Sequence, residues 1–348
     1  MEAKETVMIT KAGLIRWAGL SAALLLVAAL LWQANLEKVF VTLKSIPAPA
    51  LVGVVLLQGV TIMLIALQWW SIARKMNLSL SPAQALHVNL TGAFVESITP
   101  AVKLGGEASK VILLRTYSGI DTTKAAALVG LQKGFSLVPF IFLNLFCLLG
   151  VILAGRFGDA LLSWLVGGFV LLTLVSTALI WLFFFPGSVR KAWNRFPVNP
   201  GGPLKKGVDR WLSFLQEALT SGVRDRGFLC SQGLLSLAIW LLFPVKAFFI
   251  AYFLGLDVGF FHLAVATYLA YMAGMVPLLP GGLGTFEGSI VLLLVPAGVP
   301  LHQGMVLALV FRFVTFWLVF LVSASYLGFY ALFAGRNKTH FSPGRNMK

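Results

Sequence analysis

The stretch ITPAVKLGGEASKVILLR occupies residues 98–115, and a related stretch, LLPGGLGTFEGSIVLLLV, occupies residues 278–295. Aligned at one constant offset, the two stretches match Glu107 with Glu287, and they also match a proline and a serine. In both, Pro and Gly interrupt an apolar run, a carboxylate follows, and the apolar run resumes. Proline lacks a backbone N–H and glycine destabilises helices, so neither interruption is predicted to be a helix interior. A charged, broken apolar segment in each half of a chain is typical of secondary-transporter binding sites.

The composition places the chain in a membrane. Of its 348 residues, 59% are hydrophobic and only 11% are charged, and the mean hydropathy is +0.90. Soluble domains carry about 25% charged residues. The formal net charge of +15 is expected to lie in cytoplasmic loops that face anionic lipid. We therefore predict an all-α polytopic membrane protein and no nucleic-acid partner.

Apolar runs near or above the ~20 residues that cross a bilayer predict about six full spans. They cover residues 17–32, 51–72, 129–154, 160–185, 228–254 and 304–333. A signal peptide is the alternative interpretation of the first run. The two cysteines, Cys147 and Cys230, lie in or beside these runs and are interpreted as core residues rather than a disulfide or metal pair.

The broken segments are predicted to be re-entrant hairpins. The basic loop 186–227 is assigned to the cytoplasm by the positive-inside rule. Counting spans back from it, segment 82–115 begins and ends on the inside, and its two arms are each too short to span. By the same count, segment 263–295 begins and ends outside. Two broken spans that each cross fully are the alternative, because hydropathy does not separate the two cases.

This count predicts an inverted-topology repeat with two opposed re-entrant hairpins and both termini in the cytoplasm. The predicted organisation is an N-terminal segment with the first span (1–49), repeat 1 (50–155), a linking span with the basic loop (156–227), repeat 2 (228–335) and a basic tail (336–348). Apolar residues at helical spacing around Leu212 and Leu215 suggest that part of the basic loop lies flat on the membrane.

Charged residues inside the apolar segments are the candidate functional groups. Glu107 and Glu287 stand near the start of each second arm, where a carboxylate can simply complement the helix dipole. Within a bilayer an ionisable group is costly and marks a candidate site, and we favour that interpretation. Lys103 and Lys110 lie four residues before and three after Glu107, close enough on a helix for an ion pair.

Three further cations lie within apolar spans: Lys133, Lys246 and Arg312. Lys133 lies near the end of its span, where snorkelling to the interface accounts for a lysine. Arg312 is too deep for easy snorkelling, so it needs a partner, and Glu287 or a bound anion are the candidates. Lys246 follows a proline in the middle of its span.

These observations give two sets of candidate residues. Substrate binding is assigned to Lys103, Glu107, Ser109, Lys110, Arg115, Lys133, Lys246, Glu287, Ser289 and Arg312. Hinges of the two hairpins are assigned to Pro100, Gly105, Gly106, Pro280, Gly281, Gly282 and Gly284. The sequence contains no nucleophile elbow, no metal-ligand spacing among its histidines and no glycine-rich nucleotide loop. We expect no enzyme activity, no cofactor and no metal.

At these residues the sequence resembles the flippase-like family, also called the lysylphosphatidylglycerol synthase transmembrane region family. TPAVKLGGEASKVILLR resembles its Pro, then Gly-Gly-Glu-x-x-[Lys/Arg] segment, and PLLPGGLGTFEGSIVLLL resembles its PGGLG signature followed by Glu. Arg312 with Thr315 and Phe316 resembles its late R-x-x-[ST]-[FYW] segment. The likeness covers residues 18–332. This chain departs from the family at Gln132-Lys133, where Glu-Arg is frequent.

The resemblance implies an integral protein of a bacterial or archaeal inner membrane that moves or handles anionic or aminoacylated lipids. Polyprenyl phosphates are among the candidate substrates. In two-part members a soluble C-terminal domain transfers the amino acid, and that part is expected to be absent here. We therefore expect a lipid translocase whose partners are membrane lipids, with a homo-oligomer or a lipid-synthesis enzyme as further candidate partners. A lipid-modifying membrane enzyme and a non-transporting scaffold for lipid enzymes are the alternatives.

Overall fold

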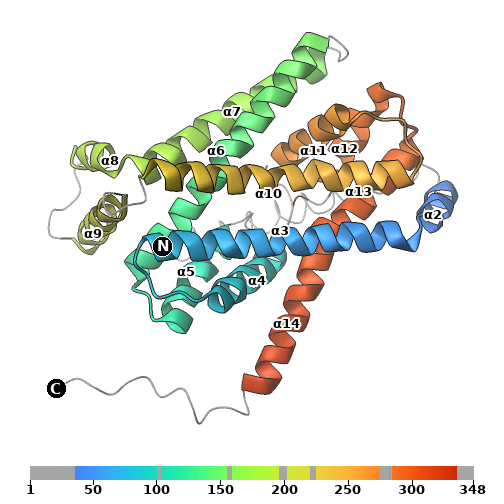
Figure 1. Ribbon diagram of the computed structural model, residues 1–348. Helices are drawn as coiled ribbons and strands as arrows, with labels where there is room; N and C mark the ends of the chain where they lie inside the picture. Colours follow the sequence, from blue (N-terminus) through green and yellow to red (C-terminus); the bar gives the residue numbers. More distant parts are fainter. Residues whose placement is uncertain are drawn as a thin grey trace, which may run out of the picture.

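A computed structural model describes residues 36–99, 104–154, 159–195, 202–219, 225–274, 282 and 284–334, and all regular structure in these ranges is helical (Figure 1). The prediction of an all-α fold is confirmed. The predicted first span, the basic tail and the residues Pro100, Lys103, Pro280 and Gly281 lie outside the described residues.

Five helical segments of the described chain are long and apolar enough to cross a membrane. Four are single helices: α3 (Ala48–Lys75), α6 (Thr122–Ala154), α7 (Asp159–Phe184) and α10 (Arg226–Phe253). The fifth joins α13 (Leu301–Arg312), the π-helix η4 (Phe313–Trp317) and α14 (Leu318–Ala334). The protein is therefore polytopic, as predicted, and these spans agree with the apolar runs in the sequence.

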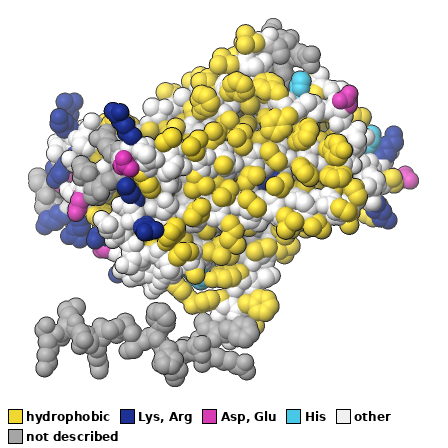
Figure 2. Space-filling view, viewed as in Figure 1, with side chains coloured by type: hydrophobic (Ala, Val, Ile, Leu, Met, Phe, Trp, Pro, Cys, Tyr) yellow, Lys and Arg dark blue, Asp and Glu magenta, His cyan; other side chains and the backbone are white. Residues whose placement is uncertain are grey.

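The outer surface of the helix bundle is apolar. Large hydrophobic side chains such as Leu56, Phe142 and Leu174 are more than half exposed. Figure 2 shows hydrophobic side chains covering the middle of the visible face, with Lys and Arg gathered mainly at the end that carries α8 and α9. Water-soluble proteins rarely expose so continuous an apolar surface, whereas a lipid-facing surface requires one.

Four shorter helices form two broken pairs: α4 (Pro82–Ile98) with α5 (Leu104–Ser118), and α11 (Phe260–Gly274) with α12 (Thr285–Leu294). Within each pair the two helices pack against each other, and none reaches the ~20 residues of a full span. Helix α4 begins at a capping box in which Ser81 and Gln84 bond each other's backbone N–H, and Pro82 takes the first helical position.

Each broken pair folds back on itself. Leu80 and Ile120, just outside the two ends of the α4–α5 pair, belong to one buried apolar cluster. Val258 and Val299, just outside the ends of the α11–α12 pair, belong to a different one. The first cluster also contains Leu215 of α9, and the second contains Val39 of α2 (Leu36–Lys44). The two pairs therefore open at opposite ends of the bundle (Figure 1).

The helix contacts of the two halves come in matching sets. Helix α4 packs on α3, α5 and α14, and α11 packs on α10, α12 and α6. In the same way, α5 contacts α6, and α12 contacts α13. Helices α3 and α10 pack directly on each other and run in opposite directions, since Gln58 early in α3 bonds Lys246 late in α10, and Gln68 late in α3 bonds Ser236 early in α10.

The basic loop after α7 forms α8 (Pro186–Trp193) and α9 (Pro203–Ala218). The expected amphipathic helix is present, but its apolar face does not lie free for a membrane. Leu212 and Leu215 are buried at 1% and 0% exposure, and α9 packs on α6. The helical spacing of apolar residues is visible in the loop sequence because it is local. The packing of α9 on α6 is not visible there, because it joins distant parts of the chain.

The glycines assigned as hinges fall into two kinds. Gly282 and Gly284 have φ angles of 69° and 80°, which are left-handed and favour glycine. A Cβ on Gly282 would also lie 2.8 Å from the carbonyl oxygen of Gly274. Gly105 and Gly106 instead lie in the first turn of α5, and a Cβ on Gly106 would stand 2.7 Å from the Cβ of Glu96 in α4. Their role is close packing of α5 on α4, not a turn.

Candidate functional site

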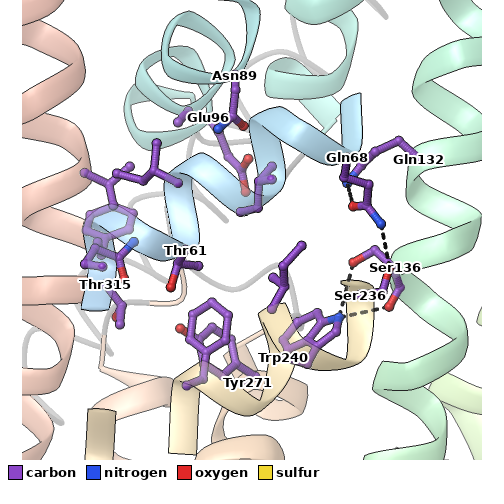
Figure 3. Close-up of a pocket in the computed structure, with 18 of the residues that line it drawn as sticks. Thr61, Gln68, Asn89, Glu96, Gln132, Ser136, Ser236, Trp240, Tyr271 and Thr315 are labelled. Carbon is purple, nitrogen blue, oxygen red and sulfur yellow. Dashed lines mark hydrogen bonds between the residues drawn. The ribbon is translucent and has the colours of Figure 1, made fainter. Parts of the chain in front are cut away.

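A polar cavity of about 300 Å³ lies inside the bundle, where both broken pairs meet the long helices. Its wall combines amide, hydroxyl and charged groups with aromatic rings (Figure 3). The polar lining residues are Gln58, Thr61, Gln68, Asn89, Glu96, Glu107, Lys110, Gln132, Lys133, Ser136, Ser236, Arg312 and Thr315. Polar groups that converge on a cavity with apolar and aromatic walls are typical of a ligand pocket.

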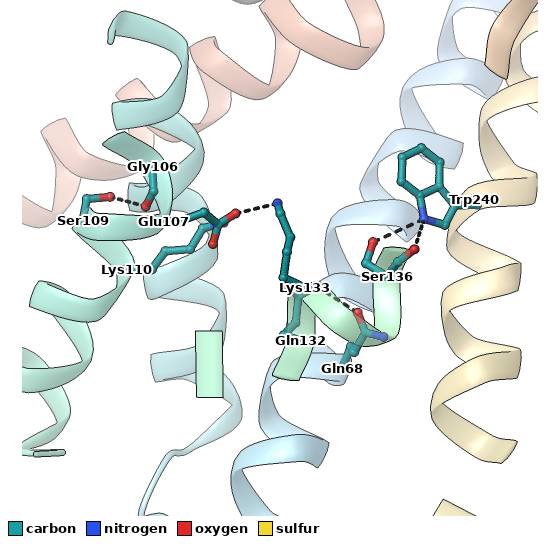
Figure 4. Close-up of polar contacts among 9 residues, drawn as sticks. All are labelled: Gln68, Gly106, Glu107, Ser109, Lys110, Gln132, Lys133, Ser136 and Trp240. Carbon is teal, nitrogen blue, oxygen red and sulfur yellow. Dashed lines mark hydrogen bonds and ion pairs between the residues drawn. The ribbon is translucent and has the colours of Figure 1, made fainter. Parts of the chain in front are cut away.

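Glu107 on α5 holds two ammonium groups at the cavity (Figure 4). Its Oε1 lies 3.2 Å from Nζ of Lys110 and 2.7 Å from Nζ of Lys133, which comes from α6. The predicted pair with Lys110 is confirmed, and Lys133 is a partner rather than a snorkelling lysine. The other carboxylate oxygen, Oε2, is buried and makes no hydrogen bond to the described residues. One carboxylate thus contacts two cations, and Glu96 supplies a second carboxylate to the lining of the same cavity.

Glu287 on α12 makes the corresponding contact in the second half. Its Oε1 lies 3.3 Å from Nε of Arg312, and both side chains are 7% exposed. Its Oε2 accepts a 2.6 Å hydrogen bond from the N–H of Gly284, so the same carboxylate also caps α12. Of the two partners considered for Arg312, the structure shows the carboxylate.

The guanidinium of Arg312 also lies against two rings. Its central carbon is 5.0 Å from the ring centre of Phe286 and 4.4 Å from that of Phe316. The planar guanidinium stacks on aromatic faces, which holds Arg312 in place. The helix changes to π geometry immediately after Arg312, and π-bulges occur frequently at functional sites.

The two ion pairs have the same construction. Each joins a carboxylate near the start of the second short helix to a cation on the long helix that follows: α5 to α6, and α12 to α13. Glu107, Lys133 and Arg312 all line the one cavity, and Glu287 lies behind Arg312. The cavity therefore lies between two carboxylate–cation pairs, one from each broken pair of helices.

Lys246 does not reach the cavity. Its Nζ donates to Oε1 of Gln58 at 2.6 Å and to Oγ1 of Thr61 at 3.1 Å, and the side chain is fully buried between α10 and α3. Gln58, Thr61 and Phe243 line the cavity, so Lys246 stands directly behind its wall. The ammonium is 4.3 Å from the ring centre of Phe243.

Three further residues assigned to substrate binding lie away from the cavity. The hydroxyls of Ser109 and Ser289 donate to the carbonyls of Gly106 and Thr285 in their own helices. Arg115 is exposed in the last turn of α5. Helical serines commonly satisfy their hydroxyls in this way, so the matching position of the two serines also has a purely structural explanation.

The uncharged polar residues that line the cavity were not predicted from the sequence. The Nε2 of Gln132 donates to Gln68 at 3.0 Å, Gln68 donates to Ser236 at 2.5 Å, and the indole N–H of Trp240 donates to the backbone of Ser136 at 2.9 Å. These bonds join α6, α3 and α10 around the cavity. An amide within an apolar run could have indicated them, because buried amides in lipid require partners.

Comparisons with known proteins agree with this architecture. Residues 16–323 match the family described as "Lysylphosphatidylglycerol synthase TM region". A UPF0104 membrane protein of Methanothermobacter thermautotrophicus is 25% identical over 283 residues, covering 79% of this chain and 83% of that protein. A UPF0104 membrane protein of Pyrococcus horikoshii is 23% identical over 304 residues, covering 84% of this chain and 90% of that protein.

Proposed function

The chain belongs to the lysylphosphatidylglycerol synthase transmembrane region family and is an integral membrane protein, and from this premise we propose that it is a lipid translocase. It moves an anionic or aminoacylated headgroup across the cytoplasmic membrane while the acyl or prenyl chains stay in the bilayer. The observation that carries the proposal is the polar cavity between two carboxylate–cation pairs, inside a bundle whose outer surface is apolar.

In this proposal the two broken pairs are re-entrant hairpins of an inverted repeat. The matching helix contacts and the openings of the two pairs at opposite ends of the bundle support it. Hairpins entering from opposite faces place short-helix ends near the middle of the bilayer and thin the polar barrier that a headgroup must cross. The basic end with α8 and α9 is assigned to the cytoplasm, together with both termini.

The headgroup phosphate is expected to bind at Lys110 and Lys133. A phosphate can replace Glu107 as the partner of the two ammonium groups, and the carboxylate can recover its lysines when the anion leaves. Arg312 supplies a third cation to the cavity lining. Glu96 lines the cavity as well and offers a carboxylate for an amine on an aminoacylated or ethanolamine headgroup.

A reconstituted flipping assay tests the function. Purified protein in vesicles that contain a fluorescent NBD-phosphatidylglycerol should make nearly all of the probe accessible to external dithionite, whereas protein-free vesicles protect the inner-leaflet half. Panels with NBD-labelled ethanolamine, lysyl and polyprenyl-phosphate lipids would show the headgroup class.

The same vesicles separate the two rival functions. A covalently changed lipid, detected by mass spectrometry, would identify a membrane enzyme instead. Protection of half of every probe, with each lipid chemically unchanged and the protein folded, would favour a scaffold and contradict the translocase.

A further inference from the structure

Two hydrogen-bonded pairs join α3 to α10, one between neutral side chains and one that includes a lysine. Both helices have 28 residues, beginning at Ala48 and Arg226. Counted from these starts, Gln58 and Ser236 take the same position, and so do Gln68 and Lys246. The bond from Lys246 to Gln58 is thus the counterpart of the bond from Gln68 to Ser236. A neutral pair holds one side of the crossing, so packing alone does not require a lysine on the other side.

The environment of Lys246 does not fix its charge. In the described part of the chain it forms no ion pair, and both of its hydrogen-bond acceptors are neutral. The Thr61 hydroxyl donates its own proton to the carbonyl of Leu57 at 2.9 Å, so its oxygen can accept from Lys246. A charge at this depth is costly, and an ionisable residue there marks a candidate functional site.

Both protonation states of Lys246 fit the same site. A neutral amine has two N–H groups, which the oxygens of Gln58 and Thr61 can accept, and its lone pair then needs no donor from the wall. The ammonium has a third N–H, and the Phe243 ring, 4.3 Å away, favours the cation. The proton can therefore be gained or lost without breaking either bond to α3.

The other ionisable groups around α10 do not supply a counter-charge in the described residues. The helices packed on α10 are α3, α6, α11 and α13. Their ionisable residues are Arg74, Lys75, Lys124, Lys133, Cys147, His262, Tyr268, Tyr271, His302 and Arg312. None of these is a carboxylate. The nearby carboxylates Glu107 and Glu287 reach across from α5 and α12 to Lys133 and Arg312. Glu96 of α4 lines the cavity, and Lys246 lies outside that lining.

Lys246 is also placed to respond to whatever fills the cavity. Its two acceptors and the ring beside it form part of the cavity wall. An anionic headgroup inside the cavity stabilises the ammonium across that wall, and its departure favours the neutral amine. By linkage, protonation of the amine must then favour binding of the anion to the same degree.

We propose that Lys246 is the proton-binding site through which lipid translocation draws on a transmembrane proton gradient. The inference rests on the translocase proposed above and names its driving ion. The balanced step is uptake of one proton by the neutral amine from the aqueous side to which the cavity is open, with one anionic headgroup. After the cavity opens to the other side, the headgroup and the proton both leave. Lipid anion and proton move together.

The test uses the leaflet distribution of NBD-phosphatidylglycerol at steady state in vesicles with an imposed pH gradient. With one proton per lipid, the ratio of probe in the two leaflets should shift by up to about tenfold per pH unit. At steady state the free energy of the probe ratio balances the free energy of the proton-concentration ratio. Nigericin in potassium buffer, which collapses the pH gradient by exchanging K+ for H+, should abolish the shift. Trapped pyranine should record proton movement that depends on the lipid.

Three variants should reach a steady-state leaflet ratio that does not respond to the gradient, and this ratio is compared rather than the flipping rate. Lys246→Gln copies the neutral residue at the matching position of α3, and Lys246→Arg stays charged. Gln58→Glu supplies a carboxylate that fixes the lysine as an ammonium, and it keeps the proposal testable if the lysine variants fail to fold. Lys191→Gln, which removes an exposed lysine of α8, should retain the shift.

The outcomes separate this inference from the proposed function. A wild-type protein that equilibrates the probe but shows no gradient-dependent shift and no pyranine signal overturns the proton site and leaves the translocase standing. A full shift in any folded variant of the three also overturns it. A folded wild-type protein that moves no lipid in the panel overturns both proposals.

Discussion

Arg312→Gln is expected to lower the free energy of unfolding by about 3–5 kcal/mol, because it removes one partner of a buried ion pair. The Glu287 carboxylate would remain buried, at 7% exposure, while still accepting a hydrogen bond from the N–H of Gly284. The aromatic contacts of the guanidinium with Phe286 and Phe316 are lost as well. Thermal and denaturant unfolding of the purified protein in detergent measures the effect.

A double variant separates loss of the pair from loss of packing. Arg312→Gln with Glu287→Gln removes both charges, so it should recover most of the stability while flipping stays low. Lys75→Gln is the matched control: it breaks an exposed pair with Asp225, 3.6 Å apart, and should change stability by about 0–1 kcal/mol. A single variant as stable as the wild type, or a double variant no more stable than the single one, would contradict this account of Arg312.

Glu107→Gln is expected to slow flipping by about ten- to a hundredfold, the equivalent of one charge-assisted hydrogen bond. The variant leaves Lys110 and Lys133 without the carboxylate that lies 3.2 Å and 2.7 Å from them. An anionic headgroup should then bind more tightly and leave more slowly, because no carboxylate recovers the lysines. The dithionite assay gives the rate, and native mass spectrometry gives the amount of bound phosphatidylglycerol.

Two controls accompany this prediction. Glu107→Gln with Lys133→Gln restores the charge balance and should release the bound lipid, although flipping remains below the wild-type rate. Asp257→Asn removes an exposed carboxylate between α10 and α11 and should change neither quantity. Flipping at the wild-type rate in Glu107→Gln would reduce this residue to a helix-start charge. Weaker lipid binding in that variant would contradict its role in release.

The sequence predicts those features that depend on neighbours along the chain. Pro and Gly interrupt helices locally, so the breaks before α5 and α12 were visible. The pair between Glu107 and Lys110 follows from a three-residue separation on one helix. The apolar runs gave the long helices because a bilayer sets their length and composition.

Contacts between distant helices were not predictable in the same way. The partner of Lys133 comes from another helix, and the acceptors of Lys246 depend on how α3 crosses α10. Arg312 was recognised as needing a partner because an unpaired charge in lipid costs at least about 2.5 kcal/mol. The sequence left Glu287 as one candidate of two, since only packing brings α12 to α13.

The claim on which the mechanism depends is that the two broken pairs enter the membrane from opposite sides. Single cysteines in a background without Cys147 and Cys230 test it directly, at the exposed positions Ser81 and Thr122 around the first pair, and Asp257 and Pro300 around the second. In intact cells, a membrane-impermeant maleimide should label positions 257 and 300. It should label positions 81 and 122 only after the cells are lysed. Labelling of the two positions of either pair from opposite sides would contradict the hairpins and the path between them.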